Sequence, residues 1–184
     1  MESSKAMRTK DRPVQQQLYY RHEQKYYLNQ YEAVLLGQRL SATMDHDEHA
    51  NKRGEYFIRS LYFDTAYNSA VVAKLAGVES RRKYRIRIYN MRDDNIRYEC
   101  KQKQGPFICK RSFSIDRKTC DKLIAGDPTP LLKYDAPLAK EVYVLMRGEG
   151  LHPVVLIDYI REAFVADVQD VRITFDKELR TGVR

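Results

Sequence analysis

Basic side chains recur at every second position between Arg81 and Arg111. In the run KYRIRIY, this spacing puts Lys83, Arg85 and Arg87 on one face of a β-strand, because successive strand side chains point to opposite faces. The run RYECKQK groups a second set in the same way, namely Arg97, Glu99, Lys101 and Lys103. The whole stretch holds eleven Lys or Arg residues against three Asp or Glu residues. The pattern predicts a cationic strand face that binds phosphate groups.

A face of this kind is unfavourable without an anion, because like charges directly opposite on paired strands destabilise a sheet. Arginine dominates the run, and its planar guanidinium suits two-pronged recognition of phosphate. The alternative is a solvated outer face with no ligand, which is the ordinary role of a charge run. The strict alternation on successive strands favours phosphate binding. Tyr84 and Tyr98 fall on the opposite face, which argues against a sheet that stacks RNA bases.

Composition fits one soluble domain with a polyanionic partner. The 184 residues are 43% hydrophobic and 32% charged, with a formal net charge of +8 and a pI of about 9.3. This balance favours a phosphorylated small molecule, polyphosphate, nucleic acid or an anionic membrane as partner. We see no apolar run long enough for a membrane span and no apolar signal core at the start. The three cysteines lack CxxC spacing, so we expect reduced thiols in a cytoplasm.

The elements that must position these side chains alternate between strands and helices. Residues 1–15 read as a disordered basic lead, and residues 16–184 as the domain itself. The segment LYYRHEQKYYL alternates as a strand, and Asn29 with Glu32 forms a capping-box signature for the next helix. A strand follows in YFIRSLYFDT, then a short helix through AYNSAVVAKLAG, with Gly77 as its C-terminal stop.

The second half of the chain continues the pattern. The polar run MRDDN closes a hairpin between the two basic strands, and ICKRSFSI adds another strand. Helices are predicted in RKTCDKLIAG and from Pro137 to Arg147, separated by the breaker DPTP. A long strand in PVVLIDYIREAFVAD, a turn at DVQD and a strand in VRITFDKEL complete the chain. This order predicts an α+β fold built on an antiparallel sheet.

Several motifs, taken in order, resemble the VTC domain, the polyphosphate polymerase domain of the CYTH-like triphosphate tunnel metalloenzymes. The resemblance runs from Arg21 to Leu179. It rests on six runs whose order and spacing match that family: RHEQKYYL, SLYFDT, RRKYRIRIY, YECKQKQG, DYIREAF and VRITFDKEL. It implies a closed antiparallel β-barrel with flanking helices, the tunnel, whose inner wall binds the triphosphate of a nucleotide. Family members continue to a further strand that closes the barrel, so we expect this barrel to lack its closing strand.

The resemblance also implies an activity and a site. Enzymes of the family transfer the terminal phosphoryl group of ATP to a growing inorganic polyphosphate chain, with a divalent metal, Mn²⁺ or Mg²⁺. The implied catalytic phosphate-binding residues are Arg85, Arg87, Lys101, Arg161 and Arg172. Further substrate contacts are predicted at Arg21, Lys25, Lys83, Lys103 and Arg111, and metal ligands at Glu99 and Glu23.

Three classes of function stay open on the sequence: a polymerase, a hydrolase of tripolyphosphate or nucleoside triphosphates, and a binding module without turnover. The phosphate acceptor is not specified by these residues, and a membrane-associated partner stays open. Arg161 and Arg172 could instead form structural ion pairs with Asp158 or Asp176, and Glu99 could pair with a neighbouring arginine. We expect Arg85→Ala to weaken triphosphate binding about tenfold or more and to leave the stability of the ligand-free protein unchanged or raised.

Overall fold

The computed structural model describes residues 19–166 and 171–183. They form an α+β fold of eight strands and four α-helices with one 3₁₀ helix, in agreement with the predicted class. The strands are β1 (Tyr20–His22), β2 (Asp45–His46), β3 (Glu55–Asp64), β4 (Ser80–Tyr89), β5 (Arg92–Gln104), β6 (Phe107–Ile115), β7 (His152–Val165) and β8 (Arg172–Val183). The helices are α1 (Gln30–Ser41), α2 (Ser69–Leu75), α3 (Arg117–Ile124), η1 (Thr129–Lys133) and α4 (Pro137–Gly148).

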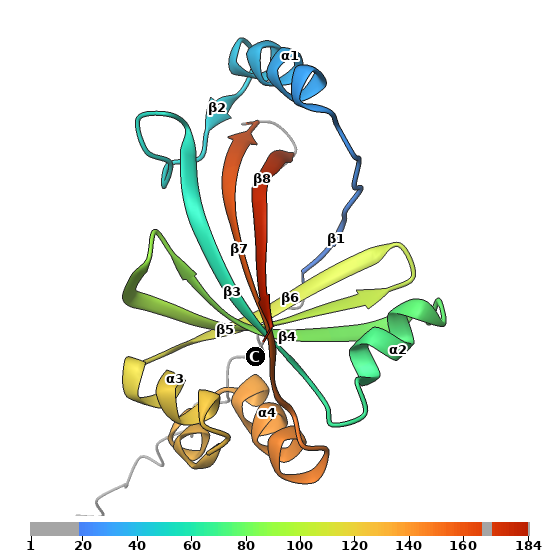
Figure 1. The fold of residues 1–184 in the computed structure, drawn as a ribbon, viewed down its shortest axis with the longest axis vertical. Coiled ribbons are helices and arrows are strands. Elements are labelled where there is room, and N and C mark those ends of the chain that lie inside the picture. The colour runs from blue at the N-terminus through green and yellow to red at the C-terminus, as the bar shows by residue number, and fades with distance from the viewer. Residues whose placement is uncertain (1–18, 167–170, 184) are drawn as a thin grey trace, which may run out of the picture.

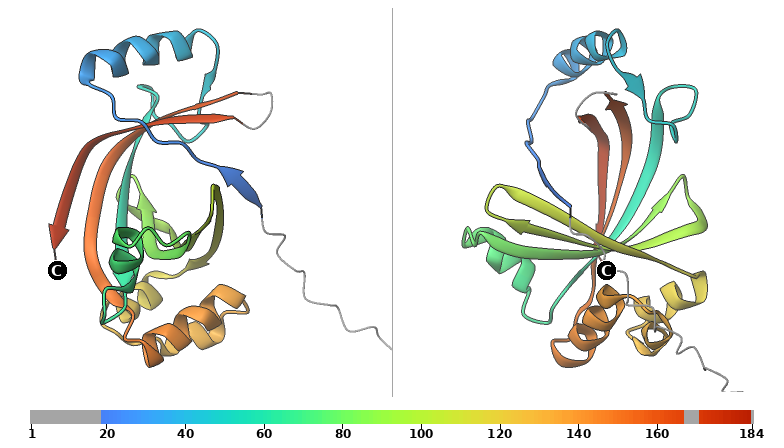
Figure 2. Two further views of the ribbon diagram at one scale, coloured as in Figure 1. Left: turned by 90° about the vertical axis from the view of Figure 1, so that its right-hand side faces the viewer. Right: turned by 180° about the vertical axis from the view of Figure 1, so that it is seen from behind.

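All strands belong to one antiparallel sheet in the order β1-β6-β5-β4-β3-β7-β2, with β8 on the other edge of β7. The sheet curls, so that β4, β5 and β6 cross β3, β7 and β8 (Figures 1 and 2). In the described part of the chain β8 pairs with β7 and β1 pairs with β6, so the sheet is curled like a tunnel wall but is not closed. The tunnel-like sheet agrees with the expected fold.

The period-two pattern of β4 and β5 separates an apolar face from a charged one, as predicted. Tyr84, Ile86, Tyr98 and Cys100 are buried in the main hydrophobic core. This core lies between the sheet and α3, η1 and α4, which sit beneath β4 to β6 in Figure 1. The helices therefore cover the outer face of these strands, and the charged side chains lie on the inner face of the curl.

Local signals in the sequence explain several element boundaries. Asn29 and Glu32 form the predicted capping box at the start of α1, with hydrogen bonds of 2.8 and 2.9 Å. Asp64 accepts a hydrogen bond from the Ala70 backbone N–H at 2.9 Å and so satisfies a free donor in the first turn of α2. Gly126 follows α3 with φ of +87°, a conformation that favours glycine at a helix end.

Three boundaries differ from the prediction. The hairpin between β4 and β5 turns at Asn90 and Met91, both with positive φ, so most of the run MRDDN lies within β5. Two central residues with positive φ match the twist of the flanking strands, which allows a tighter turn than the polar run suggested. β1 keeps only three residues of the alternating first segment, and the breaker DPTP leads into η1. The predicted turn DVQD at 167–170 and the lead at 1–15 lie outside the described residues.

Two helices contribute nothing to the core. Neither α1 nor α2 has a buried residue, although α1 carries Tyr31 and Val34 and α2 carries Val71 and Val72. No helix in the described part of the chain is long and apolar enough to cross a membrane.

Candidate functional site

The inner side chains of β3, β4, β5 and β6 lie in rows that run across the sheet. The strand register pairs Arg85 with both Tyr62 and Glu99, and it pairs Glu99 with Ser112. We call this set the glutamate row. On one side of it lies the arginine row, which consists of Ser60, Arg87, Arg97 and Ser114. On the other side lies the lysine row, which consists of Lys83, Lys101 and Lys110. Directly opposite residues of antiparallel strands have Cβ atoms about 5 Å apart, so each row brings its side chains together.

Glu99 is the buried centre of the glutamate row, and its side chain is only 2% exposed. One carboxylate oxygen accepts from Arg85 Nε at 2.8 Å and lies 2.7 Å from Arg85 Nη2. The same oxygen lies 3.9 Å from Arg87, and the other oxygen lies 3.4 Å from Lys110 Nζ. Burial alone raises the pKa of Glu99, but the three cations outweigh it and hold the pKa at about 2. Glu99 is therefore the ionised counterion of cations from both neighbouring strands.

Arg85 and Arg87 of β4 are held by different partners. Arg85 donates to the Tyr62 hydroxyl at 3.0 Å, and its guanidinium lies 5.7 Å from the centre of that ring. Arg87 is buried and donates to Ser60 Oγ at 3.1 Å and to the Tyr159 hydroxyl at 2.8 Å. Hydroxyl groups thus fix Arg87. Among the described residues, its one carboxylate partner is Glu99, 3.9 Å away.

Three lysines stand side by side in the lysine row, each directly opposite the next. Lys101 donates to both carboxylate oxygens of Glu23, at 2.6 and 2.7 Å. Burial lowers the pKa of Lys83, and the surrounding cations, Lys25 among them, lower it further. Three neighbouring ammonium groups repel one another, so this row favours an anionic ligand.

Arg161 and Arg172 come from the wall formed by β7 and β8. Arg161 donates through Nε and Nη2 to the two carboxylate oxygens of Asp176, at 2.7 and 2.8 Å. Arg172 pairs with Asp47 and donates to the Tyr56 hydroxyl at 2.8 Å. Asp176 is one of the two partners that the sequence left open for both arginines, whereas Asp47, the partner of Arg172, is not. A guanidinium has five N–H donors, so both arginines retain donors for a second anion.

The remaining predicted contacts lie mostly at the lysine end of the rows. Lys103 is directly opposite Arg81 on one side and Ile108 on the other, and Ile108 is opposite Arg21. Lys25 is close enough to the lysine row to lower the pKa of Lys101, although burial is the larger cause of that shift. These positions extend the cationic inner face along β4 and β5.

Arg111 is a correction to the predicted set. Its partner across β5 is Cys100, so its side chain points to the helix-covered face. There it donates to both carboxylate oxygens of Glu141 on α4, at 2.6 and 3.1 Å. Adjacent residues of a strand face opposite ways, so only one of Lys110 and Arg111 can lie inside, and the register places Lys110 there.

Sequence reasoning missed three side chains that complete the inner face. Lys110 could have been found by carrying the period-two count from β5 across the hairpin to β6. Tyr62 and Tyr159 lie within the motifs SLYFDT and DYIREAF, and their hydroxyl groups hold Arg85 and Arg87. The tyrosines on this face are thus hydrogen-bonded to arginines, while Tyr84 and Tyr98 are buried on the other face, as predicted.

The divalent metal implied by the resemblance does not fit the carboxylates predicted to bind it. Glu99 is enclosed by Arg85, Arg87 and Lys110, and Glu23 binds Lys101 through both oxygens. A cation at either carboxylate would have to displace or approach these positive charges. Residues 19–166 and 171–183 contain no group of three or more His, Cys, Asp or Glu side chains that could hold a metal ion.

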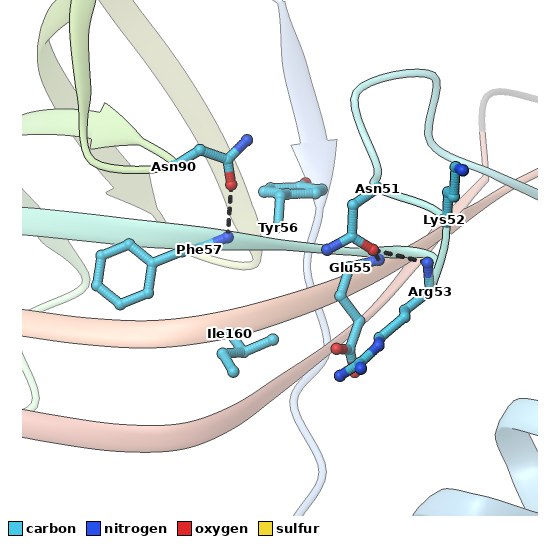
Figure 3. A pocket seen from close by; sticks show the side chains of 8 residues that line it. All are labelled: Asn51, Lys52, Arg53, Glu55, Tyr56, Phe57, Asn90 and Ile160. Carbon is cyan, nitrogen blue, oxygen red and sulfur yellow. Dashed lines mark hydrogen bonds between the residues drawn. The ribbon is translucent and has the colours of Figure 1, made fainter.

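A separate pocket of about 470 Å³ is lined by none of the side chains of these rows (Figure 3). Phe57 and Ile160 face each other across β3 and β7, and the Asn90 side chain accepts from the Phe57 backbone N–H at 3.0 Å. The complete lining is Asn51, Lys52, Arg53, Glu55, Tyr56, Phe57, Asn90 and Ile160. None of the predicted site residues is among them, so this pocket is not the candidate site.

Comparison with known proteins supports the family suggested by the motifs. The chain resembles, in fold, a solved structure of a candidate adenylyl cyclase from Hippeastrum that is described as revealing a dominant triphosphatase activity. That similarity has a TM-score of 0.54 and 17% sequence identity, and it covers 85% of this chain and 69% of the other. No curated protein sequence matches the chain. The model of the VTC domain family matches residues 20–183, which is most of the chain. The chain therefore belongs to the VTC domain family.

Proposed function

We propose that this domain is a polyphosphate polymerase-type phosphotransferase, which transfers the terminal phosphoryl group of ATP to a growing inorganic polyphosphate chain on its inner face. The observation that carries the proposal is the excess of cations in the three rows. One carboxylate, that of Glu99, is the acidic partner of Arg85, Arg87 and Lys110 together. The carboxylate of Glu23 is the acidic partner of Lys101. A polyanion removes the repulsion among these groups, so its binding is favoured at this face.

The residues of the site act by position and charge. Phosphoryl transfer requires little covalent chemistry from the protein, because charge spreads over the oxygens of the transferred group. Arg85, Arg87 and Lys101 hold the triphosphate from one wall, and Arg161 and Arg172 supply their free donors from the other. Fixed donors aimed at the developing charge stabilise the transition state. The acceptor is a terminal phosphate oxygen, which is already ionised, so the site needs no general base.

A second candidate function is hydrolysis of tripolyphosphate or a nucleoside triphosphate on the same face, with water as acceptor. The triphosphatase activity described for the Hippeastrum protein of similar fold favours this alternative. A binding module for polyphosphate without turnover is the third candidate. All three use the same cationic rows and differ only in what accepts the phosphoryl group.

Several finer expectations accompany the proposal. We expect ATP and inorganic polyphosphate or triphosphate as ligands, with no nucleic acid, and a domain that occupies residues 16–184. The three cysteines in the described residues are free thiols, which supports the expected cytoplasmic location. The need for Mn²⁺ or Mg²⁺ and a membrane-associated partner both stay predictions.

Incubation of the protein with ATP and Mn²⁺ tests the proposal. Products are run on a gel for polyphosphate and assayed in parallel for free phosphate. Arg85→Ala serves as the site variant, and Arg117→Gln on the exposed surface of α3 serves as the matched loss of one positive charge. The polymerase is supported if the unchanged protein and Arg117→Gln both make polymer and Arg85→Ala makes none. Free phosphate without polymer supports the hydrolase, and binding without either product supports the binding module.

A further inference from the structure

The arginine row contains one cation, Arg97, that has no role in the proposed function. Arg97 lies directly opposite Arg87 on one side and Ser114 on the other. Its guanidinium donates to Ser112 Oγ at 2.9 Å and to Ser114 Oγ at 3.5 Å. The side chain is half-buried, and Ser114 is exposed, so solvent and ligands can reach this end of the row.

Arg97 differs in its partners from most of the other arginines of the sheet. Arg85, Arg111 and Arg161 each bind a carboxylate through two nitrogen atoms. Among the residues that the structure describes, no carboxylate lies within ion-pair distance of Arg97. It faces Arg87 instead, and like charges directly opposite on paired strands destabilise a sheet. Glu99 partly balances Arg87, but no carboxylate of the described residues balances the charge of Arg97.

The hydroxyl groups around Arg97 are arranged to donate to an anion. Ser112 and Ser114 each accept a hydrogen bond from the guanidinium, which leaves each hydroxyl proton free for another acceptor. The guanidinium itself has five N–H donors, and these two contacts use two of them. A tetrahedral anion with several acceptor oxygens matches this set of donors, and phosphate is such an anion.

The position of Arg97 on the sheet indicates which phosphate group it would bind. Arg81, Lys83, Arg85 and Arg87 line one face of β4, and at about 3.3 Å per residue this line is roughly 20 Å long. A triphosphate has three phosphorus atoms joined by two oxygens and is much shorter. Arg97 lies beside the Arg87 end of this line, on the side away from the lysine row.

We propose that Arg97, with Ser112 and Ser114, forms a further phosphate subsite that holds a phosphoryl group of a linear polyphosphate beyond the three held by the triphosphate-binding residues. This inference rests on the proposed function, because it assumes that phosphates bind the inner face. It adds a site that distinguishes chains longer than a triphosphate from the triphosphate itself.

Isothermal titration calorimetry tests the subsite with two probes, inorganic tripolyphosphate and a size-fractionated linear polyphosphate longer than the row. Both are measured at one fixed ionic strength, because salt screens these contacts. The measured quantity is the ratio of the two affinities per chain. We expect Arg97→Gln to lower the preference for the longer chain about tenfold, as for one charge-assisted contact. Arg97→Lys retains the charge without the guanidinium fork, so we expect its preference for the longer chain to lie between those of the unchanged protein and Arg97→Gln.

Arg117→Gln is the matched control, because it removes one positive charge from an exposed ion pair on α3. It is expected to leave the preference unchanged, and melting curves confirm that each variant is folded. An equal loss of affinity for both probes in Arg97→Gln would place Arg97 in the triphosphate site and overturn the subsite. No loss for either probe would overturn it as well. Failure of the unchanged protein to bind tripolyphosphate would instead overturn the proposed function.

Discussion

The two faces of β4, β5 and β6 are both rich in arginine, yet they use it differently. On the outer face, Arg82 and Arg111 meet one carboxylate, Glu141 of α4, at 3.2 and 2.6 Å. Tyr84 donates its hydroxyl to the same carboxylate at 2.6 Å. Every one of these groups therefore has a partner, and the network fixes α4 against the sheet.

The inner face also has a central carboxylate, Glu99, but it carries further cations around that centre. Glu99 gathers Arg85, Arg87 and Lys110 much as Glu141 gathers the outer arginines. Beyond these, the two other rows add Lys83, Lys101 and Arg97, and among the described residues only Lys101 has an acidic partner, Glu23. The density of arginine is thus a poor guide to a ligand site. The balance between cations and the carboxylates they can reach separates the proposed ligand-binding face from the structural one.

The strongest test of this contrast is Arg111→Ala, at a position that the sequence assigned to the site and the structure removes from it. Loss of this half-buried partner of Glu141 is expected to lower the free energy of unfolding by about 3 kcal/mol. Chemical denaturation measures that loss, and calorimetry with tripolyphosphate measures binding by the folded variant. We expect the affinity to change less than about twofold. A stable variant with tenfold weaker binding would show that Arg111 reaches the ligand after all.

Arg85→Ala is the inner counterpart. Tripolyphosphate affinity is expected to fall about tenfold or more, since a charge-assisted contact is worth about 1.5–3 kcal/mol. The sequence predicted unchanged or raised stability, but the bidentate contact with buried Glu99 predicts a loss instead. That loss is smaller than for Arg111→Ala, because Arg87 and Lys110 stay beside Glu99. Unchanged affinity at 25 °C with a lower melting temperature would make Arg85 a structural residue.

The sequence predicted the faces of the strands well and the partners of the side chains poorly. Alternation placed Arg85 and Arg87 on one strand face, because period two is a property of every strand, and the family resemblance placed that face inside. Alternation within one strand did not decide between Lys110 and Arg111, because that choice also needs the pairing of β5 with β6 across their hairpin. Nor could it show that Glu99 is enclosed by cations from two neighbouring strands, because such contacts exist only after the sheet has formed.

Glu99→Gln tests whether the central carboxylate is a counterion that competes with the ligand. Removal of one negative charge from the inner face is expected to strengthen tripolyphosphate binding by about 1 kcal/mol, or about fivefold. The pKa of Glu99 is about 2, below the ordinary 4.5, so its ion pairs stabilise the fold above pH 4.5. This stabilisation is lost as the pH falls from 4.5 toward 2. The variant should therefore be less stable at neutral pH and lose less stability over that interval. Weaker binding by Glu99→Gln would contradict the counterion role.

The smallest expected effect is that of metal on binding. Glu99 and Glu23 are occupied by Arg85, Arg87, Lys110 and Lys101, so neither offers a free carboxylate to a divalent cation. A metal ion that binds the phosphates also removes part of the negative charge that attracts them to the rows. We therefore expect tripolyphosphate affinity in EDTA to equal or exceed that in Mg²⁺ or Mn²⁺, with a difference below about threefold. Calorimetry on the unchanged protein and on Glu23→Gln, under both conditions, measures this. Glu23 would be a metal ligand after all if metal raised the affinity of the unchanged protein more than tenfold and did not raise that of Glu23→Gln.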